Sequence, residues 1–98
     1  MIIVTGSIIA RAESLDILLA ICLEHVRRSR TEPGCLAHAV YQDAENPLRL
    51  IFLEEWADRE SLAAHFTVPA SREFVKTLQE LTVSSSGIKI YDATSISL

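Results

Sequence analysis

The chain has 98 residues, 49% of them hydrophobic, with a formal net charge of −4 and an isoelectric point near 5.2. This length suits one domain over residues 1–98, and the acidic charge argues against nucleic acid as a partner. No apolar run approaches the roughly 20 residues of a membrane-spanning helix, and the N-terminal segment lacks the basic flank of an export signal. Cys22 and Cys35 are too few for a disulfide framework. We therefore expect a cytoplasmic protein with reduced thiols and no membrane partner.

The first part of the chain predicts a strand followed by a helix. Residues 2–10 are nearly all β-branched or apolar, which indicates a strand buried on both faces. Apolar residues then recur at helical spacing from about Ser14 to Arg30, with Ser14 as the expected N-cap. Pro33 and Gly34 end this helix, because proline cannot continue it and glycine permits a tight reversal.

A basic cluster lies at the end of the predicted helix. Arg27, Arg28 and Arg30 sit where cations interact favourably with the helix dipole. We expect a solvated helix end there rather than a phosphate-binding patch. His25 precedes this cluster on a face that we expect to be exposed, and it is assigned no role.

The rest of the chain predicts a hairpin, two helices and a last strand. The strands 35–42 and 49–56 are joined by a polar, turn-rich connector. Asp58 is the expected cap of a short helix, Pro69 interrupts it, and a further helix covers about 70–81. Residues 84–87 are expected to be a loop, and the last strand is expected to start at Ile88.

The predicted order β-α-β-β-α-α-β is that of an α+β, ferredoxin-like subunit with an antiparallel sheet. In strand 49–56, Leu50 and Phe52 point to one face and Ile51 and Leu53 to the other. Helices in this topology cover one face only, so the other would be a large exposed apolar patch. The pattern predicts a homodimer in which a second copy covers that face.

Several motifs resemble the antibiotic biosynthesis monooxygenase family: the segments 32–36 (Glu-Pro-Gly-Cys-Leu), 40–43 (Val-Tyr-Gln-Asp), 54–56 (Glu-Glu-Trp) and 64–66 (Ala-His-Phe), followed by Pro69. Together they span nearly the whole chain in order. The resemblance implies a dimeric α/β barrel that oxidises aromatic polyketides or quinols with molecular oxygen, without metal, haem or flavin. It also covers relatives that isomerise or degrade small signalling molecules, and members without known activity.

The chain departs from the family pattern at two places. A second histidine often follows the proline, whereas Ala70 and Ser71 follow Pro69 here. His38 occupies a strand position where relatives often carry tyrosine. The chemistry of the pocket can therefore differ from that of better-known members.

His65, at the end of the short helix, is the expected catalytic residue. A neutral imidazole there could take a proton from a phenol, and the resulting anion could reduce oxygen directly. The alternative is a histidine that only caps a helix end. Trp56 offers a flat apolar wall on which an aromatic substrate could stack, or it fills the core.

Four further residues are candidates for substrate binding. Glu54 shares a strand face with apolar residues, where burial would raise its pKa unless a partner such as Arg72 made it structural. His38 also faces an apolar side, where a hydrogen-bonded core histidine is the commoner role. Phe66 and Phe74 are expected in the core first and in the pocket lining second.

Other chemistries are disfavoured by the spacing of residues. The histidines are widely scattered in sequence and there is no Cys-x-x-Cys, which argues against zinc. No glycine-rich phosphate loop is present, and the last helix lacks the histidine of haem-degrading relatives. We expect no cofactor. Besides the monooxygenase, an isomerase or degradative enzyme for a small oxygenated metabolite, and a non-enzymatic dimer that binds a hydrophobic ligand, remain open.

Overall fold

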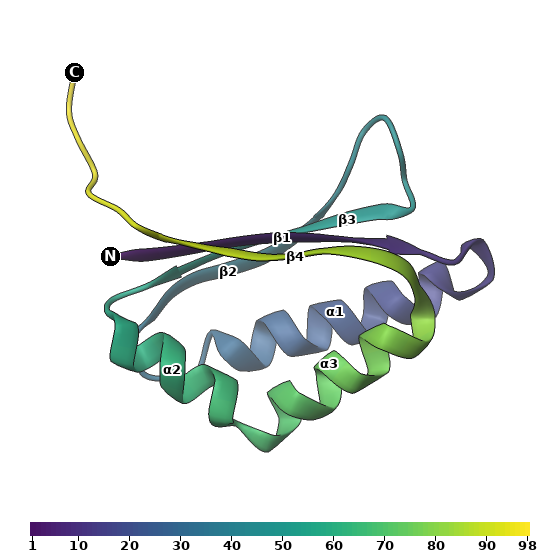
Figure 1. Cartoon of the computed structure of the whole chain (residues 1–98), viewed down its shortest axis with the longest axis horizontal. Helices are drawn as coiled ribbons and strands as arrows, with labels where there is room; N and C mark the ends of the chain where they lie inside the picture. The colour runs from purple at the N-terminus through teal and green to yellow at the C-terminus, as the bar shows by residue number, and fades with distance from the viewer.

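The computed structural model describes residues 1–98 as a four-stranded sheet with helices on one face (Figure 1). Its elements are β1 (Ile2–Ala10), the 3-10 turn η1 (Ala12–Ser14), α1 (Leu15–Ser29), β2 (Cys35–Gln42), β3 (Arg49–Trp56), α2 (Arg59–Thr67), α3 (Pro69–Leu81) and β4 (Thr82–Asp92). The sheet order is β2-β3-β1-β4 and every neighbouring pair is antiparallel. This confirms the predicted α+β, ferredoxin-like fold.

Alternation along β1 and β3 puts one set of apolar side chains under the helices. One buried cluster joins Ile8 and Leu50 to Leu18 and Cys22 of α1. A second cluster joins Ile2, Val4, Trp56 and Leu62 at the other end of the sheet. Between the two clusters, this face of the strands holds Gly6 and Glu54 beside Phe52, and these three residues line a cavity.

The opposite face of the sheet carries no helix (Figure 1). Tyr41, Leu53 and Tyr91 are exposed, by 54%, 39% and 47%. Leu53 is the register partner of Thr5 and Ala39 on the neighbouring strands, so it lies in the middle of this face. The sheet therefore presents an apolar surface to solvent, as the alternation predicted.

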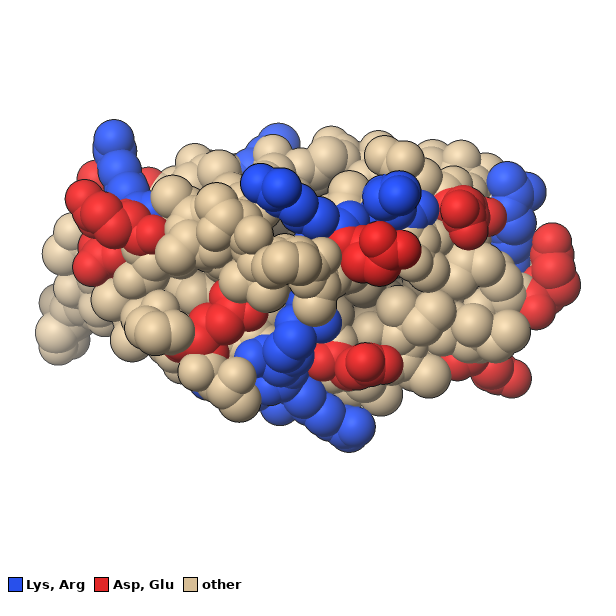
Figure 2. Space-filling model, turned by 90° about the horizontal axis from the view of Figure 1, so that it is seen from below, with Lys and Arg blue, Asp and Glu red and all other residues tan.

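The surface of the helical layer is of mixed charge. Acidic and basic side chains are interspersed there, without a face of one sign (Figure 2). No helix combines the length and the apolar character that a membrane crossing requires.

Ser14 is the N-cap residue of α1, as predicted, but its side chain does not cap the helix, because the hydroxyl donates to the carbonyls of Arg11 and Leu81 instead. One local prediction was wrong. Residues 84–87 are not a loop but part of the edge strand β4, which pairs with β1 through two register shifts. An edge strand on which almost every residue is exposed needs little apolar character, so its serines concealed it.

The turn before β2 packs against the start of α2. Gly34 has a φ of 81°, and a Cβ at this position would collide with the side chain of Ser61. Its carbonyl accepts a hydrogen bond of 2.8 Å from the amide of Ala57. The Asp58 carboxylate caps α2 by accepting from the Ser61 amide at 2.8 Å, as predicted. This docking fixes the segment that contains Glu32 relative to α2.

Candidate functional site

A cavity of about 570 Å³ lies between the sheet and the helices α2 and α3. Its volume is within the range of roughly 300–1,000 Å³ typical of small-molecule sites. Seven of its 17 lining residues are hydrophobic, and the polar ones include His25, His38, Glu54, His65 and Arg72. The cavity can therefore hold an aromatic-sized molecule with polar groups around part of it.

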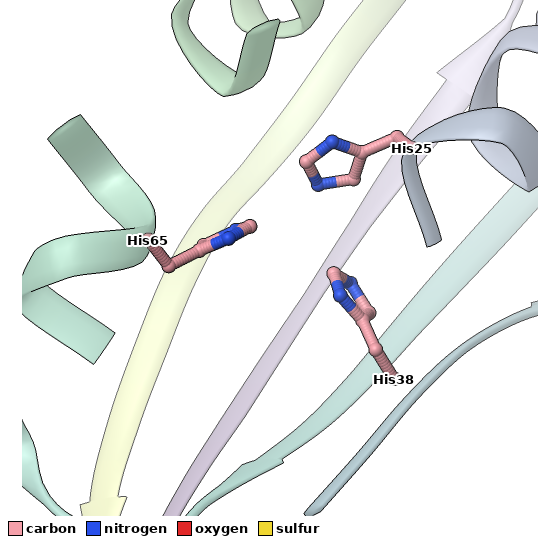
Figure 3. A group of neighbouring side chains, drawn as sticks. All are labelled: His25, His38 and His65. Atoms are coloured by element: carbon pink, nitrogen blue, oxygen red, sulfur yellow. The ribbon is translucent and has the colours of Figure 1, made fainter. Parts of the chain in front are cut away.

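Three histidines from different elements converge in this cavity: His25 of α1, His38 of β2 and His65 of α2 (Figure 3). The distances between ring centroids are 5.3, 5.4 and 5.9 Å. All three side chains are at most 5% exposed. The expectation of an exposed His25 was wrong, and residues that are scattered in sequence form one cluster in space.

His25 was missed, although helical spacing contained the signal. It lies on the same stripe of α1 as Leu18, Cys22 and Val26, the buried residues of that helix. Its ring stacks on Phe74 with centroids 3.8 Å apart and an interplanar angle of 6°. The neighbouring arginines indicated a solvated face, and this concealed the buried position of His25 beside them.

Arg28 determines which ring nitrogen of His25 carries the proton. The Arg28 Nη2 lies 2.7 Å from the His25 Nδ1 and also donates to the Ser71 hydroxyl at 3.2 Å. A guanidinium can only donate, so Nδ1 accepts and the proton of the neutral ring is on Nε2. Burial chiefly, and then the neighbouring His38, His65 and Arg28, lower the pKa of His25 to about 3. The ring is therefore neutral at pH 7.

His65 forms a buried pair with Glu32, a residue of the motif 32–36 that was not among the predicted site residues. The His65 Nδ1 lies 2.8 Å from the Glu32 Oε1. A carboxylate only accepts, so Nδ1 is the donor and Nε2 is left free beside the cavity. A carboxylate behind an imidazole in this way orients the ring and stabilises its protonated form.

Trp56 does not line the cavity, so of its two expected roles, a stacking wall for the substrate and a core residue, the structure supports the second. The indole is fully buried, and its ring centroid is 4.8 Å from that of His65, behind the cavity wall. Its Nε1 donates to the Glu54 Oε1 at 2.9 Å. Glu54 does line the cavity, and burial raises its pKa although the Trp56 hydrogen bond acts in the opposite direction. Arg72 lines the cavity as well but forms no ion pair with Glu54.

His38 lines the cavity without a hydrogen bond to either ring nitrogen. Its Nε2 is 3.7 Å from the Glu54 Oε2, which is too long for a hydrogen bond. Burial, followed by the charges of His65, Arg30 and Arg28, lowers its pKa to about 4. Buried polar atoms are nearly always paired in folded proteins, so these two nitrogens indicate that a ligand or water completes the site.

Phe66 and Phe74 lie in the cavity lining, together with Phe52, where they form an aromatic wall. Leu36 does not reach the cavity. A register shift between Cys35 and Ala37 leaves it without a partner on β3, and its side chain is 58% exposed.

The three histidines are the group that comes closest to a metal site, because one nitrogen of each ring lies within 4.8 Å of the others. The Glu32 carboxylate behind His65 also fits the usual support of a metal-bound histidine. However, zinc–nitrogen bonds of about 2.0–2.1 Å in tetrahedral geometry place ligand atoms only about 3.3 Å apart. A metal-bound His25 would also have to donate from Nδ1, where Arg28 already donates. As arranged here, the cluster does not fit a metal ion.

The family model for antibiotic biosynthesis monooxygenases matches residues 1–77. The chain belongs to this family. Among curated proteins, an uncharacterised protein of Synechocystis (sll1783) is 32% identical over 90 residues, which are 92% of this chain and 61% of that protein. The chain thus spans less than two thirds of that relative's length.

Solved structures with the same fold are similar to this chain. A conserved protein from Methanosarcina mazei Go1 is 30% identical, with a TM-score of 0.88 over 95% of this chain and 92% of its own. A candidate antibiotic biosynthesis monooxygenase from Deinococcus radiodurans is 24% identical, with a TM-score of 0.94 over 100% of this chain and 97% of its own. The latter likeness concerns the fold alone.

Proposed function

We propose that this protein is a cofactor-independent monooxygenase that oxidises a small aromatic substrate, such as a quinol or a polyketide-like phenol, with molecular oxygen. The observation that carries the proposal is the Glu32–His65 pair, which leaves an imidazole nitrogen free at a cavity of about 570 Å³ with an aromatic wall. Membership of the antibiotic biosynthesis monooxygenase family supports the same class of reaction.

In this mechanism His65 acts as the general base. Its Nε2 takes the phenolic proton, and Glu32 stabilises the imidazolium that forms. The electron-rich phenolate gives one electron to oxygen, and the superoxide and the substrate radical join through a new carbon–oxygen bond. The resulting hydroperoxide loses water as its O–O bond breaks. One quinol and one O2 thus yield one hydroxyquinone and one water, without another reductant.

The remaining cavity residues position the substrate. Phe52, Phe66 and Phe74 can contact an aromatic ring by stacking or edge-to-face packing. Glu54, with its pKa raised by burial, lies next to His38 and can accept or donate a hydrogen bond. Trp56 acts indirectly, because its indole holds Glu54 in place.

A second candidate is an isomerase or degradative enzyme for a small oxygenated metabolite. The hydroxyl and charged groups of the lining, Ser7, Ser71, Arg72 and Ser85, favour this alternative. It would use the same His65 base but would consume no oxygen. A non-enzymatic dimer is supported less, since the cavity is neither filled nor without polar groups.

We further propose that the protein acts in the cytoplasm as a homodimer of one-domain subunits, with the two sheets face to face. The exposed Tyr41, Leu53 and Tyr91 on the sheet face without helices support this arrangement. A second copy placed there would cover the apolar surface that one chain leaves open.

The test is oxygen consumption by the purified protein with a panel of hydroquinones and anthrones. We expect uptake with at least one substrate, a product that contains one atom of 18O from labelled O2, and loss of uptake in His65→Ala. Leu23→Ala, on the exposed face of α1, is the matched control. Turnover of a panel compound without oxygen uptake would favour the second candidate. Oxygen uptake that His65→Ala leaves unchanged would contradict the assigned base.

A further inference from the structure

We infer that His25 is a second catalytic residue, whose Nε2–H donates a hydrogen bond to the same substrate oxygen from which His65 takes the proton. The inference rests on the proposed function to the extent that the substrate carries an ionisable hydroxyl. It assigns to the histidine cluster one acceptor and one donor that face a single oxygen atom. The only bond changes are the loss of the substrate O–H proton and its gain by His65.

The hydrogen-bond partner on the Nδ1 side of each ring determines which ring donates and which ring accepts at Nε2. Arg28 donates to the His25 Nδ1 at 2.7 Å, which leaves the His25 proton on Nε2. Glu32 accepts from the His65 Nδ1 at 2.8 Å, which leaves the Nε2 of His65 free to accept. One ring therefore presents a donor and the other an acceptor, and no hydrogen bond from the protein occupies either Nε2.

The spacing suits one oxygen atom between the rings. One nitrogen of each of the three rings lies within 4.8 Å of the corresponding nitrogens of the other two. An oxygen can form hydrogen bonds of about 2.8 Å to two nitrogens that are up to about 5.6 Å apart. The unpaired nitrogens of His38 lie in the same cluster, which indicates that the network is incomplete without a ligand.

His25 is suited to donate a hydrogen bond to an anion, and it keeps its own Nε2 proton while it does so. Its ring is held by the stack on Phe74 and by Arg28, so the donor needs no reorganisation during the reaction. The positive charge of Arg28 on the opposite nitrogen polarises the Nε2–H bond. A neutral imidazole used in this way resembles an oxyanion-hole donor, and the loss of such a donor typically lowers turnover about 10²–10³-fold.

The arrangement also narrows the class of substrate. A phenol, hydroquinone or enol presents an oxygen that becomes negative when His65 removes its proton. A substrate that is deprotonated only at carbon, without an adjacent oxygen to carry the charge, would leave the His25 donor unused. We therefore expect the cavity to bind such hydroxylated compounds as anions.

The first experiment tests the tautomer directly and does not depend on activity. In 15N-labelled protein, the imidazole nitrogens of His25 should show a protonated Nε2 and an unprotonated Nδ1 from pH 7 to pH 5. Arg28→Met should give a mixture of tautomers, and Arg28→Lys should restore the Nε2–H form because lysine also donates only. A wild-type His25 protonated on Nδ1, or an Nε2 that binds stoichiometric Zn²⁺, would overturn the inference.

The second experiment measures anion binding with 4-nitrophenol, whose ionised form absorbs visible light. Wild-type protein should raise the ionised fraction of bound nitrophenol, and His25→Phe, which keeps the stack on Phe74, should weaken binding of the phenolate at least tenfold. Ile17→Ala, on the exposed side of α1, is the control. Equal affinity of wild type and His25→Phe for the phenolate would overturn the inference.

The two proposals can fail separately. If no panel compound consumes oxygen but phenolate binding depends on His25, the proposed oxidation is wrong and the oxyanion site stands. If oxidation depends on His65 but His25→Phe keeps turnover within twofold, the oxidation stands and the role of His25 is wrong.

Discussion

Acidification from pH 7 to pH 5 should destabilise the fold through His25 and His38. Burial lowers the pKa of these residues to about 3 and about 4, whereas an unperturbed histidine has a pKa of about 6.5. Between the folded and unfolded pKa values the unfolded chain binds more protons than the folded chain. The stability of the folded state is therefore greatest above pH 6.5 and is lost as the pH falls below it.

The size of this loss of stability follows from the protonation of the two imidazoles in the unfolded chain. At pH 5 each is about 1.5 pH units below its pKa, so its protonation favours the unfolded state by about 2 kcal/mol. Glu54 opposes this trend. Its raised pKa means that the folded state keeps a proton that the unfolded carboxyl has lost, so its contribution falls as the pH rises. We expect a net loss of about 2–4 kcal/mol between pH 7 and pH 5.

Urea unfolding at fixed protein concentration, at pH 7, 6 and 5, measures this loss. His25→Phe removes one of the two titrating groups and should reduce the pH dependence by roughly half. The control Ile17→Ala should follow the wild type. A free energy of unfolding that is equal at pH 5 and pH 7 would show that the two rings are not held neutral in the fold.

Four other outcomes are expected. His65→Ala should lower turnover by about 10²–10⁴-fold while the protein stays folded by circular dichroism; a fall below threefold would exclude His65 as the base. Trp56→Phe should destabilise the fold by about 1–3 kcal/mol in urea, because Glu54 loses a buried donor; an unchanged midpoint would contradict that contact. Sedimentation should show a dimer, for which we expect a buried interface of roughly 2,000 Å² or more. A stable monomer at micromolar concentration would refute the dimer. Purified protein should show no flavin or haem absorbance and no stoichiometric metal, and a Soret band would exclude a cofactor-free mechanism.

The fold was predictable because its main elements carry clear periodic signals. The helical spacing of Leu18, Cys22 and Val26 and the alternation in strand 49–56 both match the structure. The N-cap position at Ser14 was predicted correctly, but its bonding was not, because the hydroxyl donates to the carbonyl of Leu81, which is distant in sequence. The last strand was predicted from Ile88, but its first part, residues 82–87, was missed because β4 contacts the sheet mainly through backbone pairing, and side-chain composition does not report that pairing.

The site was only partly predictable, for a different reason. His38 and Glu54 stood out as polar residues on apolar strand faces, and His65 stood out through its place at the end of the short helix and the family resemblance. All three line the cavity. Glu32 meets His65 from 33 positions away, and His25 meets His38 from 13 positions away, although its partner Arg28 is only three positions along the helix. Sequence spacing cannot report such long-range contacts. The placement of Trp56 behind the wall likewise depends on the depth of packing rather than on strand alternation.

The Gly34 turn has a consequence for engineering. The two halves of the Glu32–His65 pair are carried by different segments, and the Gly34 turn docks the segment of Glu32 on the start of α2. Any side chain at Gly34 must displace that helix, and the Glu32–His65 hydrogen bond would weaken quickly with such a displacement. A substitution there could therefore abolish turnover without altering any residue of the cavity. Screens confined to cavity residues would overlook this position, whereas directed changes in the turn offer a way to adjust the basicity of the site from outside.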